Sequence, residues 1–349
     1  MYQVYGDREF LENQYPSMKA WVEYIRKKAG DSYIWKGGSK YGDWLFYHPP
    51  VNNHSEADGF TEHDFIATAF FAYSADLLAK TAKILGNTSD EKNYSDLFEK
   101  IKAVFVREYV TPAGRIGTNS QTSYVLALMF NLLPEEQRPA AAKFLVDDIR
   151  GRRNHLSTGF LGTPFLCHVL TQNGYTDVAY DLLLQETYPS WLYPVKMGAT
   201  TIWERWDGQK PDSTFQDAGM NSFNHYAYGA IGDWMYRISA GIETQTPGYR
   251  NLLIYPRVTP RMDLSKASFE SSYGTIVSGW ERKEGRLYFT VVIPPNSTAK
   301  IVLPANSADM VTLGGLPLSG NRIPNKVSIE EGKLVVEAGS GNYLFGMDE

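Results

Sequence analysis

The sequence predicts a mainly α fold of paired helices followed by a smaller antiparallel β-sandwich. Over residues 1–243, apolar side chains recur every three or four positions, as they do on one face of an α-helix. Over residues 244–349 the pattern changes to short alternating runs separated by Gly, Pro, Asn and Ser. A chain of 349 residues is long enough for two cores. We therefore expect a helical domain at 1–243 and a β-sandwich at 244–349.

The helices are expected in hairpin pairs. The first covers Glu9 to Ile25 and ends at Gly30, and Thr88-Ser89-Asp90 marks the start of another. The remaining helices are expected at 61–85, 121–132, 135–150, 163–173, 175–186 and 221–240. The 121–132 and 163–173 segments are apolar all round, whereas 135–150 is amphipathic. Inner and outer helices of a toroid would differ in this way, because inner helices are covered on both sides.

The strands of the sandwich follow from period-two alternation between turn residues. Arg286 to Ile293, directly after Glu284-Gly285, has the pattern of one arm of a hairpin. The other strands are expected at 266–272, 274–284, 298–303, 326–330 and 333–337.

Composition excludes several kinds of partner. The net charge is −5 and no basic run occurs, which argues against binding to nucleic acid or to an anionic membrane. Cys167 is the only cysteine, so no intrachain disulfide can form. No run of about 18 apolar residues and no signal-peptide pattern occurs, so we expect a soluble chain, with the periplasm and the cytoplasm both open.

Residues 188–234 combine one carboxylate with many aromatic side chains. Glu204 lies between Trp203 and Trp206. Aromatic rings stack on the C–H face of a pyranose, while carboxylates, Asn and His bind its hydroxyls. A Trp–Glu pair alone would also fit an ordinary helix with a buried Trp and a solvated Glu. The density of aromatic residues favours a carbohydrate pocket; the other members are Trp191, Tyr193, His225, Tyr226 and Tyr228.

Other polar residues were weighed for a role in such a site. Asp43, next to Trp44, is a candidate for the pocket. Glu62 and Asp64 better fit charges at a helix start, and residues 119–122 a helix cap. His48 and His54 flank a loop, but their spacing matches no pattern of metal ligands. We expect no metal and no cofactor.

Several motifs, in order along nearly the whole chain, resemble the bacterial α-L-rhamnosidases of glycoside hydrolase family 78. The motifs are Tyr5-Gly6-Asp7 with Tyr15-Pro16-Ser17-Met18-Lys19, Gly42-Asp43-Trp44, Gly159-Phe160-Leu161-Gly162-Thr163, Tyr188-Pro189-Ser190-Trp191, Gly198-Ala199-Thr200-Thr201 with Trp203-Glu204, and Asn221-Ser222-Phe223-Asn224-His225-Tyr226. The resemblance implies an (α/α)6 six-hairpin toroid, expected to be incomplete at the N-terminus, and a C-terminal antiparallel β-sandwich.

The resemblance also implies a function, the inverting hydrolysis of terminal α-L-rhamnose from glycosides or polysaccharides. Glu204 matches the general base, His225 the histidine that binds rhamnose hydroxyls, and Trp44 a wall of the pocket. The family's general acid precedes the Tyr-Gly-Asp helix, in an acidic, Trp-rich motif that this sequence lacks, so we expect the acid outside this chain. The substrate-binding set is completed by Trp203, Trp206, Asp43, Trp191 and Asn224.

Two alternatives remain open. The chain could be a non-catalytic sugar-binding protein of the same fold, because hydrolysis needs an acid as well as a base. A toroidal lyase or epimerase, in which His225 or Tyr226 moves the proton, fits less well. An incomplete toroid would also expose helix faces such as Phe65–Tyr73, which would favour self-association.

Overall fold

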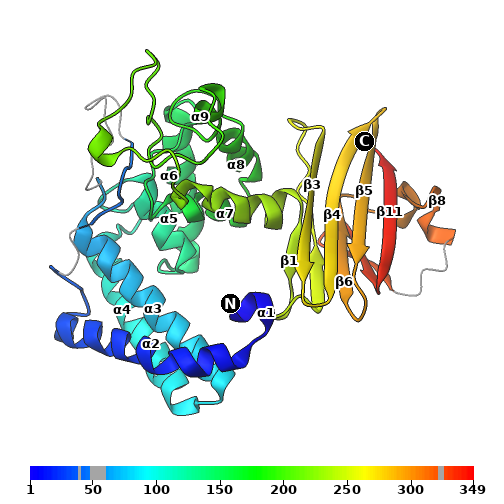
Figure 1. Cartoon of the computed structure of the whole chain (residues 1–349). Coiled ribbons are helices and arrows are strands. Elements are labelled where there is room, and N and C mark those ends of the chain that lie inside the picture. Colours follow the sequence, from blue (N-terminus) through cyan, green and yellow to red (C-terminus); the bar gives the residue numbers. More distant parts are fainter. Residues whose placement is uncertain (38–40, 48–59, 321–325) are drawn as a thin grey trace. The chain divides into compact units, whose positions relative to one another are not determined.

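The computed structural model describes residues 1–37, 41–47, 60–320 and 326–349 (Figure 1). It contains two compact units. We call Glu12–Ile231 the helical unit, and Met1–Leu11 together with Gly232–Glu349 the sheet unit. The boundary predicted between residues 243 and 244, which separates the catalytic domain from the β-sandwich, stays a prediction.

Paired helices build the helical unit, as the periodicity predicts. α3 packs mainly on α4, α5 on α6, and α7 on α8. Eight of the nine residues of α5 are buried, whereas α6 buries one face only. The expected contrast between a covered helix and an amphipathic partner is therefore present. The helices are α2 (Arg8–Ala29), α3 (His63–Leu85), α4 (Thr88–Tyr109), α5 (Gln121–Met129), α6 (Arg138–Gly151), α7 (Thr163–Gln172), α8 (Thr176–Leu183) and α9 (Leu192–Lys196). None of the helices in the described ranges has the length and apolar character needed to cross a membrane.

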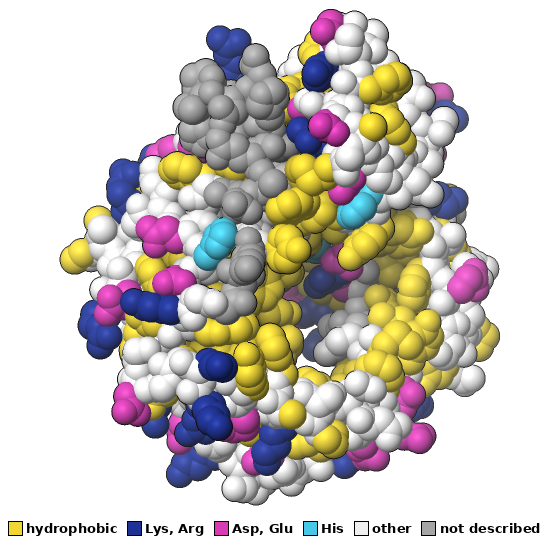
Figure 2. Space-filling view, turned by 60° about the vertical axis from the view of Figure 1, so that its left-hand side comes forward, with side chains coloured by type: hydrophobic (Ala, Val, Ile, Leu, Met, Phe, Trp, Pro, Cys, Tyr) yellow, Lys and Arg dark blue, Asp and Glu magenta, His cyan; other side chains and the backbone are white. Residues whose placement is uncertain are grey.

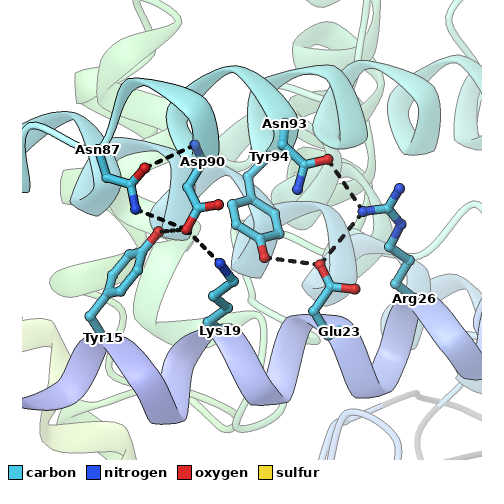
Figure 3. A network of polar contacts seen from close by, with 8 residues as sticks. All are labelled: Tyr15, Lys19, Glu23, Arg26, Asn87, Asp90, Asn93 and Tyr94. Carbon is cyan, nitrogen blue, oxygen red and sulfur yellow. Dashed lines mark hydrogen bonds and ion pairs between the residues drawn. The ribbon is translucent and has the colours of Figure 1, made fainter.

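A polar network joins α2 to α4 (Figure 3). The Asp90 carboxylate accepts hydrogen bonds from the Tyr15 hydroxyl at 2.7 Å and the Lys19 ammonium at 2.8 Å. One turn further along, the Tyr94 hydroxyl donates to Glu23 at 2.9 Å. Because the donors and acceptors alternate between the two helices, the network fixes how far α2 is shifted along α4.

The sheet unit contains two sheets. One has the strand order β1-β2-β6-β10-β9 and the other β3-β4-β5-β11-β7-β8. Their apolar side chains form one core that includes Trp280, Phe289 and Phe345. The strands are β1 (Ile242–Thr244), β2 (Asn251–Ile254), β3 (Leu264–Ser271), β4 (Gly274–Lys283), β5 (Arg286–Ile293), β6 (Thr298–Leu303), β7 (Val311–Leu313), β8 (Leu316–Pro317), β9 (Val327–Glu330), β10 (Lys333–Ala338) and β11 (Gly341–Asp348). The predicted class is confirmed with one correction: β2 pairs with β6 in parallel, so the sheets are predominantly rather than wholly antiparallel.

The predicted helix at 221–240 is wrong over residues 221–226, whereas residues 227–239 are helical. Residues 221–226 form no helix; they are followed by a 3₁₀ turn (Ala227–Ala230), the short α10 (Ile231–Trp234) and a π-helical turn (Met235–Ser239). The physical reason is tertiary: Ser222 and His225 use their backbone groups to pair with Glu204 and Ile202, which holds the chain out of the helix.

The expectation that the Phe65–Tyr73 face is exposed is also wrong. Phe65 is fully buried against Phe105, and Tyr73 is half-buried, stacking on Phe130 at 4.2 Å between ring centroids. Exposed aromatic side chains of the helical unit include Trp21 and Tyr24 on α2, which are about half exposed.

Candidate functional site

Glu204 lies where two stretches of chain pair through their backbones. Its N–H donates to the Ser222 carbonyl at 2.9 Å, and the His225 N–H donates to the Ile202 carbonyl at 2.9 Å. The Ser222 N–H returns a hydrogen bond to Oε2 of Glu204 at 2.8 Å. The half-buried carboxylate is thus oriented by a main-chain donor. Its other oxygen, Oε1, accepts no hydrogen bond within the described part of the chain.

His225, whose own backbone N–H takes part in this pairing, has a ring that is held by its neighbours. The imidazole stacks on Phe160 at 5.1 Å and on Tyr226 at 5.5 Å between ring centroids. Nδ1 lies 3.3 Å from the Ala227 N–H and accepts its hydrogen bond. A neutral imidazole with an accepting Nδ1 carries its proton on Nε2, which is the atom left to donate to a ligand.

Phe160 connects His225 to a large groove of about 1060 Å³ in the helical unit. Aromatic and aliphatic side chains make up most of its wall, and Trp44 is among them. Figure 2 shows hydrophobic side chains gathered where this face of the molecule is hollowed. Large apolar grooves edged by a few polar groups are the usual form of a small-molecule site. The other lining residues are Trp21, Tyr24, Trp35, Tyr41, Gly42, Ile66, Ala67, Phe70 and Leu161.

Asp43 lies beneath this groove wall and does not line it. Its carboxylate accepts hydrogen bonds from the Thr122 hydroxyl and from the N–H groups of Gly159 at 2.7 Å, Leu161 at 2.8 Å and Gly162 at 3.2 Å. Burial raises the pKa of the carboxyl, and these four hydrogen bonds oppose that shift. All of its contacts are internal, so Asp43 organises the loop that carries Phe160.

Gly159 has no room for a side chain at this point of the loop. A Cβ there would lie 2.2 Å from the carbonyl oxygen of Trp44, and the Phe160 N–H donates to that same oxygen at 2.9 Å. The close approach of the two backbones therefore sets Trp44 and Phe160 side by side on the groove.

The three predicted tryptophans of the Glu204 region are buried and all line a small pocket of about 40 Å³, and their role in binding a sugar stays a prediction. Trp191, Trp203 and Trp206 are 8%, 6% and 3% exposed. Trp206 stacks on Tyr228 with ring centroids 3.8 Å apart, and Trp191 donates its indole N–H to the Tyr228 carbonyl at 2.9 Å. They form a rigid aromatic base under the Glu204 segment.

Asn224, the last predicted binding residue, is exposed beside His225. Its backbone N–H donates to the Ser222 hydroxyl at 3.2 Å, and its side-chain amide makes no hydrogen bond to any described residue. The structure therefore brings Glu204, His225 and Asn224 together on one pair of segments. It joins them to Trp44 through Phe160.

A buried ion pair next to Glu204 was not predicted. Nε of Arg205 lies 3.1 Å from Oδ1 of Asp207, and both side chains are about 5% exposed. Gln216 donates to the second oxygen of Asp207 at 2.5 Å. An Arg and an Asp two positions apart around a Trp were visible in the sequence, but nothing in that spacing shows that both are buried.

The described residues contain no group of three His, Cys, Asp or Glu side chains arranged to hold a metal ion. His48 and His54 lie outside the described ranges, so the structure gives no information on that loop.

Comparison with known proteins agrees with this arrangement. Residues 1–238 match the bacterial alpha-L-rhamnosidase 6 hairpin glycosidase domain, and residues 241–315 match the bacterial alpha-L-rhamnosidase C-terminal domain. An alpha-L-rhamnosidase of Streptomyces avermitilis is 44% identical over 99% of this chain and 31% of its own length. One from Formosa agariphila is 39% identical over 97% of this chain and 36% of its own length.

Solved structures give the same result. The crystal structure of the Streptomyces avermitilis alpha-L-rhamnosidase complexed with L-rhamnose superposes with a TM-score of 0.88 at 43% identity, covering 99% of this chain and 32% of that one. The alpha-L-rhamnosidase of Aspergillus terreus superposes with a TM-score of 0.86 at 30% identity, covering 99% and 37%. The chain thus spans about a third of the length of these relatives. The match of the family model to more than half of the sequence confirms the resemblance, and the chain belongs to the bacterial α-L-rhamnosidase six-hairpin glycosidase family.

Proposed function

We propose that this chain supplies the general base and part of the sugar pocket of an inverting glycoside hydrolase that removes terminal α-L-rhamnose. The observation that carries the proposal is the fixed Glu204 carboxylate, half-buried beside His225, with Phe160 connecting the pair to an aromatic groove. Support for the sugar comes from a relative at 43% identity whose structure is described as a complex with L-rhamnose.

In the proposed reaction, Glu204 activates water. Oε2 accepts from the Ser222 N–H, so Oε1 is the atom that takes a proton from the water. The water oxygen attacks the anomeric carbon from the face opposite the leaving group, the glycosidic bond breaks, and the leaving oxygen takes a proton from an acid. We expect that acid to come from a residue outside this chain.

His225 and the aromatic residues would bind the sugar. The Nε2–H of His225 is available to donate to a hydroxyl, and its ring is held by stacking on Phe160. Phe160 and Trp44 present flat apolar surfaces for the C–H groups of a deoxy sugar. Trp191, Trp203 and Trp206 would act indirectly, by keeping the Glu204 segment rigid.

A substrate that needs no acid tests the base by itself. Fluoride leaves without the full protonation that an alkoxide requires, so the chain should hydrolyse an α-L-rhamnosyl fluoride even when it cannot hydrolyse an alkyl rhamnoside. Glu204→Gln should slow fluoride release by about 10²–10⁴-fold, the usual contribution of a general base. Release is followed with a fluoride electrode.

The matched control is Glu136→Gln, a change of the same kind at an exposed position that pairs with no described residue. It should leave the rate unchanged. Calorimetry with L-rhamnose distinguishes the alternative of a sugar-binding protein, which would bind rhamnose and release no fluoride. If Glu204→Gln retains the wild-type rate within a few fold, Glu204 is not the base.

A further inference from the structure

A second pocket, of about 380 Å³, lies at the C-terminal end of α6. None of the residues proposed to bind rhamnose lines it, and no acidic side chain does. Two tyrosines, two arginines and one histidine are among its lining residues. The lining residues are Tyr47, Gly151, Arg152, Arg153, His155, Leu156, Tyr188 and Pro189.

The pocket carries one uncompensated positive charge. Arg152 is paired with Asp148 through Nε at 2.7 Å. The side chain of Arg153 is exposed, and its guanidinium makes no hydrogen bond or ion pair with any residue in the described ranges. An unpaired guanidinium at a pocket edge is a ready partner for a planar or tetrahedral anion, because its N–H donors are fixed in a fork.

The helix end does not need these arginine side chains as caps. The carbonyls of its last turn already accept backbone hydrogen bonds: Asp148 from the Arg152 N–H at 3.0 Å, and Arg150 from the Arg153 N–H at 2.9 Å. The Asn154 N–H donates in the same way to Ile149 at 2.9 Å. The guanidinium of Arg153 is therefore not used in holding the helix end.

The pocket wall is fixed before any ligand arrives. The two ring nitrogens of His155 bond to the Arg152 carbonyl at 2.7 Å and to the Thr187 hydroxyl at 2.8 Å. Gln185 donates its amide to the carbonyls of Arg153 and Asn154, each at 3.2 Å, where both residues have φ near +57° and +58°. A wall held in this way loses little entropy when a ligand binds.

Two aromatic rings also line the pocket. Tyr47 and Tyr188 meet edge to face with ring centroids 4.6 Å apart. Burial raises the pKa of both hydroxyls, and the Tyr188 hydroxyl bonds to the carboxylate of Asp207. Aromatic surface beside a fixed cation suits a ring with C–H faces and one acidic substituent.

We propose that this pocket binds a sugar unit that carries an acidic group, a carboxylate or a sulfate, with the acid on Arg153 and the ring against Tyr47 and Tyr188. The test is calorimetry with glucose, glucuronate and glucose 6-sulfate, which share one ring and differ at the sixth carbon. At least one acidic sugar should bind about tenfold more tightly than glucose, the size of one charge-assisted hydrogen bond. Which of the two binds identifies the acid.

Two variants separate the pocket from the general charge of the helix end. Arg153→Gln should remove the preference for the acidic sugar, whereas Arg150→Gln, at the same helix end but outside the pocket, should keep it. Glu204→Gln should also keep it, so failure of the proposed hydrolase function would not affect this result. Equal binding of all three sugars, or an equal loss of the preference in both arginine variants, would overturn the proposal.

Discussion

The loops of the helical unit and the strands of the sheet unit are held in place by different kinds of interaction. Along β5, buried and half-buried residues alternate without interruption, and eight consecutive residues pair with β11. The loops around Glu204 and Asp43 have no such repeat. Each is held by one carboxylate that gathers several donors, Asp207 in the first and Asp43 in the second.

This difference determines how each region responds to substitution. In the sheets, the stabilising contacts are spread over many apolar side chains, so a small change at one of them has a limited effect. In the loops, one anchor holds several groups, and removing it leaves buried donors without acceptors. The loops should therefore be sensitive at a few polar positions, and the sheets mildly sensitive at many apolar ones.

The largest effect on stability is expected from Asp207→Leu. The substitution leaves the Arg205 guanidinium buried without its partner, which typically costs about 3–5 kcal/mol of unfolding free energy. Because Arg205 adjoins Glu204, fluoride release from the rhamnosyl fluoride should fall as well. Urea unfolding followed by circular dichroism measures the first effect and the fluoride electrode the second.

The double variant Arg205→Met with Asp207→Leu is the control, since it removes both charges together. It should recover part of the lost stability. If the single and double variants unfold at the same urea concentration, the pair is not an anchor and the contrast with the sheets is weakened.

The same difference explains which features the sequence could predict. The helix at 61–85 and the strand at 286–293 were predicted within two residues, because each has a repeating apolar pattern that does not depend on distant contacts. β2 was missed because it is four residues long and pairs in parallel with β6, more than forty positions away. The helix predicted at 221–240 starts too early for the same reason, since residues 222 and 225 pair with Glu204 and Ile202.

For the candidate site, the types of the residues predicted which of them take part, but the sequence did not predict which of their side chains are buried. Glu204 and His225 were identified from chemistry and from resemblance, and the structure brings them together. The binding role of Trp203 and Trp206 stays a prediction, and their burial could not be read from the sequence, because a tryptophan looks the same there whether it lines a pocket or supports it. Phe160, which joins His225 to the groove, was quoted only as part of a motif, because its neighbours come from distant segments.

A smaller loss of stability, about 1–3 kcal/mol, is expected from Asp43→Asn. The amide keeps one acceptor oxygen but turns an NH₂ group toward backbone N–H donors of the Gly159–Gly162 loop. Thermal unfolding measures the loss. Asp31→Asn, at an exposed position, should be neutral, and equal melting temperatures for the two variants would show that Asp43 holds nothing in place.

The sheets provide the opposite case. Ile301→Val removes one methylene from a fully buried position of β6 and should cost about 0.5–1.5 kcal/mol. Chemical denaturation measures this loss, and Ile329→Val, at a half-exposed position of β9, should cost less. A loss as large as that of Asp207→Leu would mean that the sheet core depends on single residues as strongly as the loops do.

The smallest effect is a dependence on pH at the α2–α4 network. Hydrogen bonds from Lys19 and Tyr15 lower the pKa of Asp90, so the folded state favours the carboxylate more than the unfolded state does. The stability from this site is present above the unfolded pKa of about 3.9 and is lost as the pH falls through the lower folded value. The difference in Tm between wild type and Asp90→Asn should therefore shrink between pH 7 and pH 3.

The control is Lys19→Met, which removes the first cause of the pKa shift. In the Lys19→Met background, the difference in Tm caused by Asp90→Asn should be smaller at every pH. A difference in Tm that stays constant from pH 7 to pH 3 would mean that the charge of Asp90 does not hold α2 on α4, and that Asp90 contributes only through the packing of its side chain.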